Sequence, residues 1–174
     1  MKEDIAQLVR SKLHATLKPL GFTRKRSASF LQDGEVVKLI FGDNMTRSWD
    51  EGKFLRMGYC ISSDRLEQQL FSQPMASPGT GIITSMYSPT APGLRLTEVK
   101  NIEEANQLAE VYCRTAREYL LPIFDQIHDE RSMFEFGLNN PEHIVVFEKP
   151  FKEWIVKAGY EDLLIGRTGT VNPR

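Results

Sequence analysis

The stretch Leu17-Lys18-Pro19-Leu20-Gly21-Phe22-Thr23-Arg24-Lys25-Arg26, called the hinge below, separates a helical sequence pattern from a strand-like one. Pro19 has no backbone N–H donor and clashes with the preceding turn, so a helix that runs through Lys18 should end about there. Gly21 allows a backbone conformation that is closed to other residues. We predict that this change of direction carries Phe22 into the core, where the helix meets a sheet.

Periodic patterns on both sides of the hinge predict the elements that it joins. Before it, apolar residues recur every three or four positions, which indicates one amphipathic helix over residues 3–17. After it, the β-prone segments 27–31 and 35–41 flank Gln32-Asp33-Gly34. This pattern predicts a hairpin, because Asp and Gly both tolerate positive φ in a turn.

Alternation along the strands predicts a sheet with two different faces. In the second arm of the hairpin, one face receives Val37, Leu39 and Phe41, and the other receives Val36, Lys38 and Ile40. A third strand is predicted over residues 53–62, and one of its faces carries Leu55, Met57, Tyr59 and Ile61. Together they predict an antiparallel meander with one face covered by helices.

The second half of the chain has mainly helical patterns. A long helix is predicted over residues 102–127, with Asn101 and Glu104 as a variant of the capping box at its start. Pro122 should kink this helix near Glu118. The remaining segments are an apolar cluster at 133–138, residues 144–147 that fit either a strand or a helix start, and a short helix over 151–158 ended by Gly159.

These elements predict an α+β fold. We expect a single domain over residues 1–165, with 166–174 as a flexible tail. The antiparallel sheet should have about four strands, covered on one face by the N-terminal helix and the long kinked helix. With 174 residues, the chain can bury about two thirds of its unfolded surface.

Composition limits the classes of partner and the compartment. The net charge of −1 gives no general attraction to nucleic acid or to an anionic membrane. The apolar runs are too short to cross a membrane, and the charged N-terminus lacks the apolar core of a signal peptide. Cys60 and Cys113 are interpreted as reduced core thiols, although a contact between them is not excluded. We therefore expect a cytoplasmic protein.

Charge is distributed unevenly along the chain. Residues 1–26 carry an excess of five positive charges, and residues 98–135 carry an excess of five negative charges. If both segments pack on one sheet, the domain is bipolar. The favoured interpretation is that both are solvated helix faces.

The sequence contains no motif that indicates catalysis or a cofactor. The three histidines, His14, His128 and His143, do not have metal-ligand spacing with one another or with a cysteine. His128-Asp129-Glu130 contains reactive side chains, but it lies at a predicted helix end, where polar residues are common. We expect no cofactor and no metal, and an enzymatic activity is disfavoured without being excluded.

The triplet Arg24-Lys25-Arg26 has two interpretations. It could contact a nucleic-acid backbone, which requires several bases on one surface. Strand alternation divides these three between two faces, so we favour a charged edge strand that discourages pairing with other chains.

The segment 72–94 is the first candidate for a binding surface. Its prolines and glycines forbid a helix and permit at most one short strand, and long irregular segments in compact domains are commonly functional. Together with the polar segment 42–52, it supplies four residues of types that anchor protein interfaces, namely Trp49, Met75, Met86 and Tyr87. The competing surface is the acidic face of the long helix, with Glu103, Glu104, Glu110 and Glu118.

The hinge resembles the opening of the domain-of-unknown-function 4304 family. The similarity is carried by Leu17 to Phe22, by Arg24-Lys25 and by Phe30, and it covers residues 5–41. It implies an α+β fold and a mainly bacterial origin, and it supplies no catalytic residues. Small bacterial domains of this sort also resemble immunity proteins, which neutralise a toxin by covering it.

We therefore expect a non-enzymatic domain that binds another protein, with a toxin-neutralising immunity protein as the best candidate. The alternative is a small-molecule-binding protein or enzyme with its pocket between the sheet and the long helix.

Overall fold

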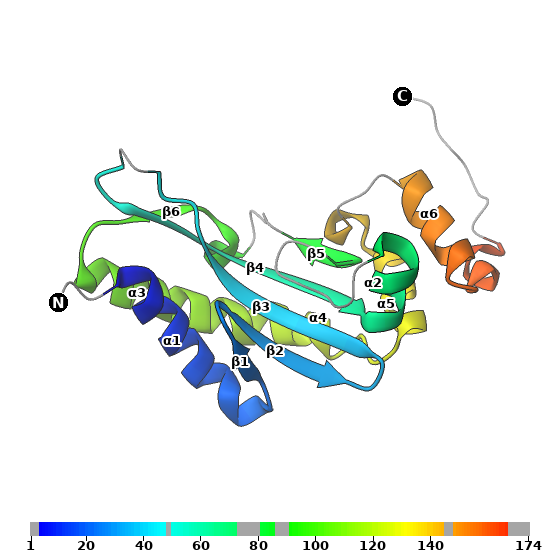
Figure 1. Cartoon of the computed structure of the whole chain (residues 1–174), viewed down its shortest axis with the longest axis horizontal. Coiled ribbons are helices and arrows are strands. Elements are labelled where there is room, and N and C mark those ends of the chain that lie inside the picture. The colour runs from blue at the N-terminus through cyan, green and yellow to red at the C-terminus, as the bar shows by residue number, and fades with distance from the viewer. Residues whose placement is uncertain (1–3, 48–49, 73–80, 86–90, 145–147, 167–174) are drawn as a thin grey trace.

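The hinge ends the first helix and starts the sheet, as predicted. A computed structural model describes residues 4–47, 50–72, 81–85, 91–144 and 148–166 (Figure 1). Helix α1 (Ile5–Leu17) is followed by one 3₁₀ turn, Lys18–Leu20, that contains Pro19. Gly21 then adopts a φ of 89°, in the left-handed region that favours glycine. Phe22 is buried, and its ring stacks on Phe124 with 6.2 Å between centroids.

The described strands form one antiparallel sheet in the order β1-β2-β3-β4-β5, and β6 also pairs with β4. The strands are β1 (Thr23–Lys25), β2 (Ala28–Asp33), β3 (Val36–Asn44), β4 (Lys53–Ser63), β5 (Ile83–Ser85) and β6 (Thr97–Val99). The prediction of about four strands therefore includes the long ones, β2 to β4. The three-residue strands β1, β5 and β6 are too short for a clear sequence pattern.

The β2–β3 hairpin turns one residue later than predicted. Asp33 pairs with Val36, so the two turn residues are Gly34 and Glu35. Gly34 supplies the positive φ, 58°, at the first turn position, and Asp33 remains in the strand.

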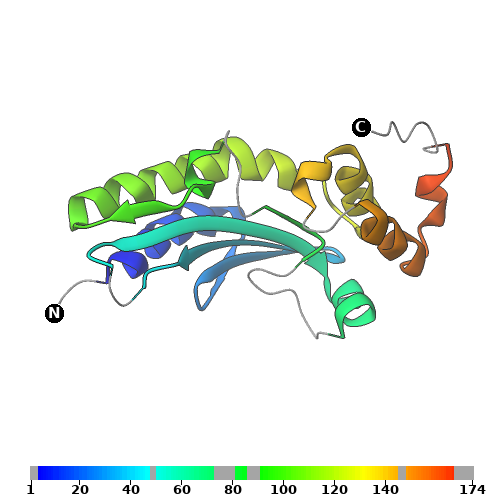
Figure 2. The ribbon, with the colours of Figure 1, turned by 90° about the horizontal axis from the view of Figure 1, so that it is seen from above.

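The two faces of the sheet carry different clusters of buried residues. The inner face, which packs on α1 and α3 (Ile102–Thr115), carries Leu55, Met57, Tyr59, Ile61, Val36 and Ile40. The outer face carries a second cluster of Ala28, Val37, Leu39, Phe41 and Cys60. The predicted alternation is therefore confirmed. Figure 2 shows α3 on one side of the sheet and α2 (Asp64–Phe71) on the other.

Helices α1 and α3 pack against each other on the inner face. The basic N-terminal segment and the acidic later segment thus share one helical layer, as the bipolar arrangement requires. The two cysteines are separated by the sheet, because Cys60 belongs to the outer cluster while Cys113 lies on α3. Both are free thiols, and Cys113 accepts a hydrogen bond from the Thr16 hydroxyl at 3.2 Å.

The long helix is interrupted where Pro122 predicts a kink. Helix α3 continues into a π-helical turn, Ala116–Leu120, and then into α4 (Leu121–Phe124). The N–H of Leu121 bonds to the Ala116 carbonyl, five residues back, immediately before Pro122. The helix ends at Phe124, three residues before the predicted end. Asn101 caps its start by accepting a hydrogen bond from the Glu104 N–H at 2.9 Å.

The C-terminal part adds two further helices, α5 (Glu130–Asn139) and α6 (Glu148–Lys157). Helix α6 begins at Glu148, earlier than predicted, because a proline in the first turn of a helix is tolerated. Gly159 follows it with a φ of 87°. Ile144 forms an isolated antiparallel bridge with Ile83, and residues 145–147, the rest of the undecided segment, lie outside the described residues.

Within the segment 72–94, the described residues form one short strand, β5, and one 3₁₀ turn, Pro92–Leu94. The sequence prediction allowed no more than this for those residues. In the described ranges, no helix combines the length and the apolar character needed to cross a membrane. The predicted tail lies outside the described residues except for Gly166.

Candidate partner-binding site

The four predicted anchor residues, Trp49, Met75, Met86 and Tyr87, all lie outside the described residues. The competing acidic surface is described. Glu103, Glu110 and Glu118 are exposed along the long helix. Glu104 is occupied in the helix cap, where its carboxylate accepts hydrogen bonds from the Lys100 N–H at 2.7 Å and the Asn101 amide at 2.8 Å.

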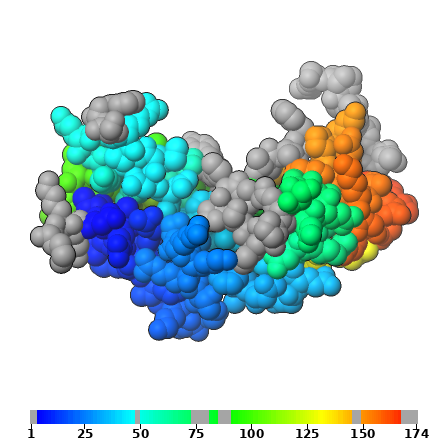
Figure 3. All heavy atoms as spheres, in the orientation of Figure 1, coloured from blue at the N-terminus to red at the C-terminus, as the bar shows by residue number. Residues whose placement is uncertain are grey.

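A hollow in the described part of the surface lies at the end of the sheet where α1 and α3 begin. It has a volume of about 860 Å³ and is lined by Asp4, Ile5, Asn44, Glu51, Gly52, Lys53, Val99, Lys100, Asn101 and Ile102. Figure 3 shows the β3–β4 end of the sheet, in cyan, above the N-terminal half of α1, in blue. Residues 44 and 51–53 are described neighbours of Trp49 in the sequence, so the hollow borders the segment that the sequence predicts to bind.

Strand pairing brings these separate segments together. Lys53 at the start of β4 pairs with Val99 at the end of β6, and Asn44 at the end of β3 pairs with Leu55. Gly52 is buried, and a Cβ at this position would lie 2.8 Å from the Glu98 side chain. A larger residue here would have to displace the Glu98 side chain.

The hollow combines charges of both signs with exposed apolar surface. Among the described residues, Lys53 and Glu51 make no ion pair, whereas Lys100 Nζ lies 3.6 Å from Glu98 Oε2. Ile102 is 40% exposed on the wall and Met45 is 48% exposed beside Asn44. The lining includes no histidine, cysteine, serine or threonine. These groups suit a contact with another molecule better than nucleophilic catalysis.

The space between the sheet and the inner helices is much smaller. The gap there is too tight to hold a water molecule, and it is lined by Ala6, Val9, Arg10, Gly42, Asp43, Leu55 and Tyr112. Sites for small organic ligands have volumes of about 300–1,000 Å³. Burial raises the pKa of Tyr112, whose hydroxyl has no hydrogen-bond partner among the described residues. This gap gives little support to a ligand pocket between the sheet and the long helix.

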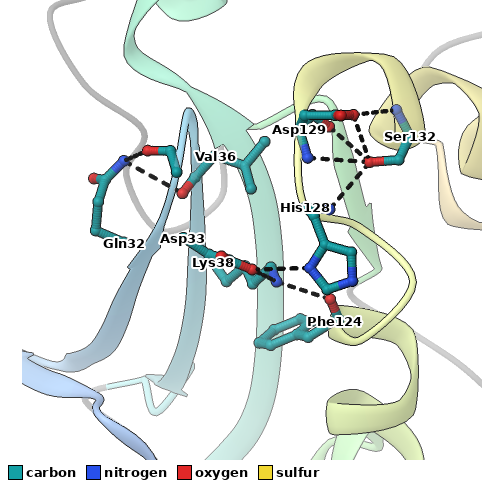
Figure 4. A network of polar contacts seen from close by, with 9 residues as sticks. Gln32, Asp33, Val36, Lys38, Phe124, His128, Asp129 and Ser132 are labelled. Carbon is teal, nitrogen blue, oxygen red and sulfur yellow. Dashed lines mark hydrogen bonds and ion pairs between the residues drawn. The ribbon is translucent and has the colours of Figure 1, made fainter.

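A buried lysine connects the β2–β3 hairpin to the end of the long helix (Figure 4). Lys38 is 2% exposed, and its ammonium group donates to Asp33 Oδ2 at 2.5 Å and to the Phe124 carbonyl at 2.8 Å. The carbonyl lies at the C-terminal end of α4, where the helix dipole favours a cation. His128 Nδ1 lies 3.3 Å from the same Asp33 oxygen. Hydrogen bonds from Lys38, supported by His128, lower the pKa of Asp33. These contacts stabilise the fold and leave no reactive amine.

A second buried cluster surrounds Glu130 at the start of α5. Its carboxylate accepts hydrogen bonds from Arg65, from the Ser63 hydroxyl at 2.5 Å and from the Tyr160 hydroxyl at 3.1 Å. Burial would raise the pKa of Glu130, but the hydrogen bonds from Arg65 and Ser63 outweigh it, so the pKa is lowered. Asp129 caps the helix by accepting from the Ser132 N–H at 2.7 Å. The triplet therefore lies at the start of α5 and not at the end of the long helix, and its Glu130 is buried.

The third buried pair, Tyr59 and His143, lies on the inner face of the sheet. The Tyr59 hydroxyl contacts His143 Nδ1, and the imidazole packs edge-on against Phe136 with 5.3 Å between centroids. Burial lowers the pKa of His143, which favours the neutral ring. Sequence reasoning did not find the contact between Tyr59 and His143 or that between Lys38 and the Phe124 carbonyl, because the partners are more than 80 residues apart in the chain.

The triplet Arg24-Lys25-Arg26 lies at the edge of the sheet. All three residues of β1 are exposed, and β1 pairs with β2 alone among the described strands. The charged-edge interpretation fits this position.

No protein-family model matches the chain, and no curated protein or solved structure matches it either. The resemblance of residues 5–41 to the domain-of-unknown-function 4304 family therefore stays an expectation from the sequence.

Proposed function

We propose that the protein is a non-enzymatic binding domain for another protein, and that the hollow at the end of the sheet is part of the contact surface. The observation that supports it is the open hollow of about 860 Å³. Its lining includes exposed Ile102 and two charged residues, Lys53 and Glu51, that make no ion pair with the described residues. Protein interfaces combine an apolar centre with polar groups around it. An occupant with complementary charges would pair both residues and cover the apolar side chain.

Within this class, we propose the more specific role of an immunity protein that neutralises a toxin by covering it. The support is an analogy: residues 5–41 resemble the domain-of-unknown-function 4304 family, and small bacterial domains of this sort resemble immunity proteins. The tight gap between the sheet and α3 makes the alternative, a small-molecule-binding protein or enzyme with a pocket there, the weaker candidate.

The experiment uses the purified product of the neighbouring reading frame as the partner. Co-expression should relieve growth arrest caused by that product, and calorimetry should detect a direct complex. Ile102→Asp and Lys53→Glu should each weaken the complex by about 1–2 kcal/mol, roughly tenfold in Kd. The matched controls are Leu20→Asp and Lys18→Glu, which change exposed residues of the same types on the hinge.

The predicted anchors are tested in the same assay. Trp49→Ala and Tyr87→Ala should each weaken binding by at least about 1–2 kcal/mol, while charge reversal at Glu110 should change it by less than about 0.5 kcal/mol. Equal losses for the hinge controls and the hollow variants would refute the assignment of the surface. A neighbouring product that neither arrests growth nor binds would refute the immunity role.

A further inference from the structure

Glu67 on α2 is a fully buried acid with no hydrogen-bond partner. Its exposed fraction is 0%, and among the described residues neither carboxylate oxygen has a hydrogen-bond partner. Glu130 is also buried, but donors from three residues satisfy its oxygens. The difference matters because an unpaired carboxylate inside a protein carries a large desolvation cost, whereas a hydrogen-bonded one does not.

The surroundings of Glu67 offer no compensating positive charge. Ser62 and Cys60 lie on the outer face of β4, and Glu67 lies close enough to raise the pKa of the Cys60 thiol beyond the effect of burial. The Ser62 hydroxyl is itself buried without a hydrogen-bond partner among the described residues. Asp64, one turn earlier on α2, has the same charge as Glu67. Arg65, the base on this helix, is bound to Glu130.

Burial therefore raises the pKa of Glu67. The nearby Ser62 hydroxyl, which does not meet hydrogen-bond geometry, lowers it by less, and the charge of Asp64 raises it again. The protonated acid is the form that the site accommodates. A glutamine or a methionine would fill nearly the same volume without ever carrying a charge. The property that distinguishes glutamate here is its ability to ionise.

Helix α2 follows β4 in the chain and lies in space beside the C-terminal helices (Figure 1). Toward the C-terminal helices it is held by three contacts. Arg65 pairs with Glu130, the Gln69 amide donates to the Lys157 carbonyl at 2.5 Å, and Phe71 packs edge-on against Trp154 at 5.0 Å. On the side of α2 that faces the outer face of β4, the buried polar residue is Glu67. A change in its charge therefore acts on the contact between helix and sheet.

We propose that Glu67 forms a pH-dependent contact between α2 and the outer face of β4. In its neutral form the contact holds the helix on the sheet, and ionisation at higher pH releases the helix. The folded protein binds this proton more tightly than the unfolded chain does. The stabilisation is therefore fully present below the ordinary carboxyl pKa and is lost as pH rises through the raised pKa of the folded state.

Trp154 reports the state of α2 through its contact with Phe71, once Trp49→Phe has removed the other tryptophan. In this background, emission recorded from about pH 4 to about pH 9 should shift in one transition. Glu67→Gln should abolish the transition, and Glu110→Gln, which changes an exposed acid on α3, should preserve it. Within the transition, the ratio of folded to unfolded protein should fall about tenfold per pH unit relative to Glu67→Gln.

Two measurements keep the proposal testable if Glu67→Gln folds poorly. Glu67→Met removes the charge with an apolar side chain, and it should also give a flat emission profile. The carboxyl carbon of Glu67, followed by NMR in the unaltered chain, should titrate well above an ordinary glutamate. Titration of that carbon at the ordinary value, or an unchanged Trp154 transition in both variants, would overturn the proposal.

Discussion

Replacing Phe22 by alanine tests whether the hinge organises the fold. The ring is 2% exposed and stacks on Phe124 at 6.2 Å between centroids, with 26° between ring planes. Removing a buried phenylalanine side chain costs about 3–5 kcal/mol of folding free energy. The lost contact between the two aromatic rings accounts for about 0.5–1.5 kcal/mol of this cost. We expect Phe22→Ala to lower the free energy of unfolding by about 4 kcal/mol.

Urea denaturation measures this change, and Leu20→Ala is the matched control. Leu20 lies two residues earlier, on the other side of Gly21, and it is 49% exposed. Its truncation should change the free energy of unfolding by less than about 0.5 kcal/mol, with the same dependence on urea. A loss below about 1 kcal/mol for Phe22→Ala, or equal losses for both variants, would show that the hinge does not anchor the core.

Three further changes have defined outcomes. Lys38→Ala should cost about 3 kcal/mol in urea denaturation because it breaks a buried ion pair, and Lys38→Met should cost less because it fills the space; equal costs would contradict the packing argument. Gly21→Ala should cost about 1–2 kcal/mol in thermal unfolding, since φ is 89°, and an unchanged Tm would contradict that backbone assignment. The pKa of Glu130 is lowered in the folded state, so its contribution is present above the ordinary carboxyl pKa and is lost as pH falls. Glu130→Gln should therefore destabilise the protein more at about pH 7 than at about pH 3, and the opposite order would contradict the Arg65 contact.

Local sequence signals predict those features that neighbouring residues determine. The prediction for the hinge is confirmed because proline restricts, and glycine widens, the range of backbone conformations at its own position. The two faces of β3 and β4 are correct because strand geometry imposes a period of two. The hairpin turn is displaced by one residue because Asp33 and Gly34 satisfy the same local preference, and the pairing of Asp33 with Val36 decides between them.

For the long helix, a local sequence rule predicts where the helix is interrupted but not which backbone conformation the interruption adopts. Pro122 removes one N–H donor from the helix, so a disturbance within the preceding turn follows from the sequence. The helix accommodates it by a hydrogen bond that spans five residues, from the Leu121 N–H to the Ala116 carbonyl. The choice between a bend and a π-helical turn depends on packing against the sheet, which the sequence pattern does not express.

The hollow depends on contacts across the whole chain, and for this reason the sequence did not predict it. Its wall is assembled from the starts of α1, β4 and α3 and from the ends of β3 and β6. Each segment is unremarkable alone, because helix caps and strand ends are normally polar. What made part of this region detectable was the irregular segment 42–52, which borders the hollow. The anchor role of Trp49 stays a prediction, whereas Lys53 and Ile102 are brought together only by the fold.

The two buried glutamates also show what local sequence cannot predict, because their environments depend on contacts between distant residues. Glu67 and Glu130 both lie in the first turn of a helix, where acids are favoured by the helix dipole, so local sequence rules do not distinguish them. Arg65 reaches Glu130 across 65 positions of the chain and leaves Glu67 without a base. The hydrogen bond from Arg65 thus helps to lower the pKa of Glu130, whereas burial raises the pKa of Glu67. It follows that the same substitution, glutamate to glutamine, should act with opposite pH dependence at the two sites, because rising pH strengthens one contact and breaks the other.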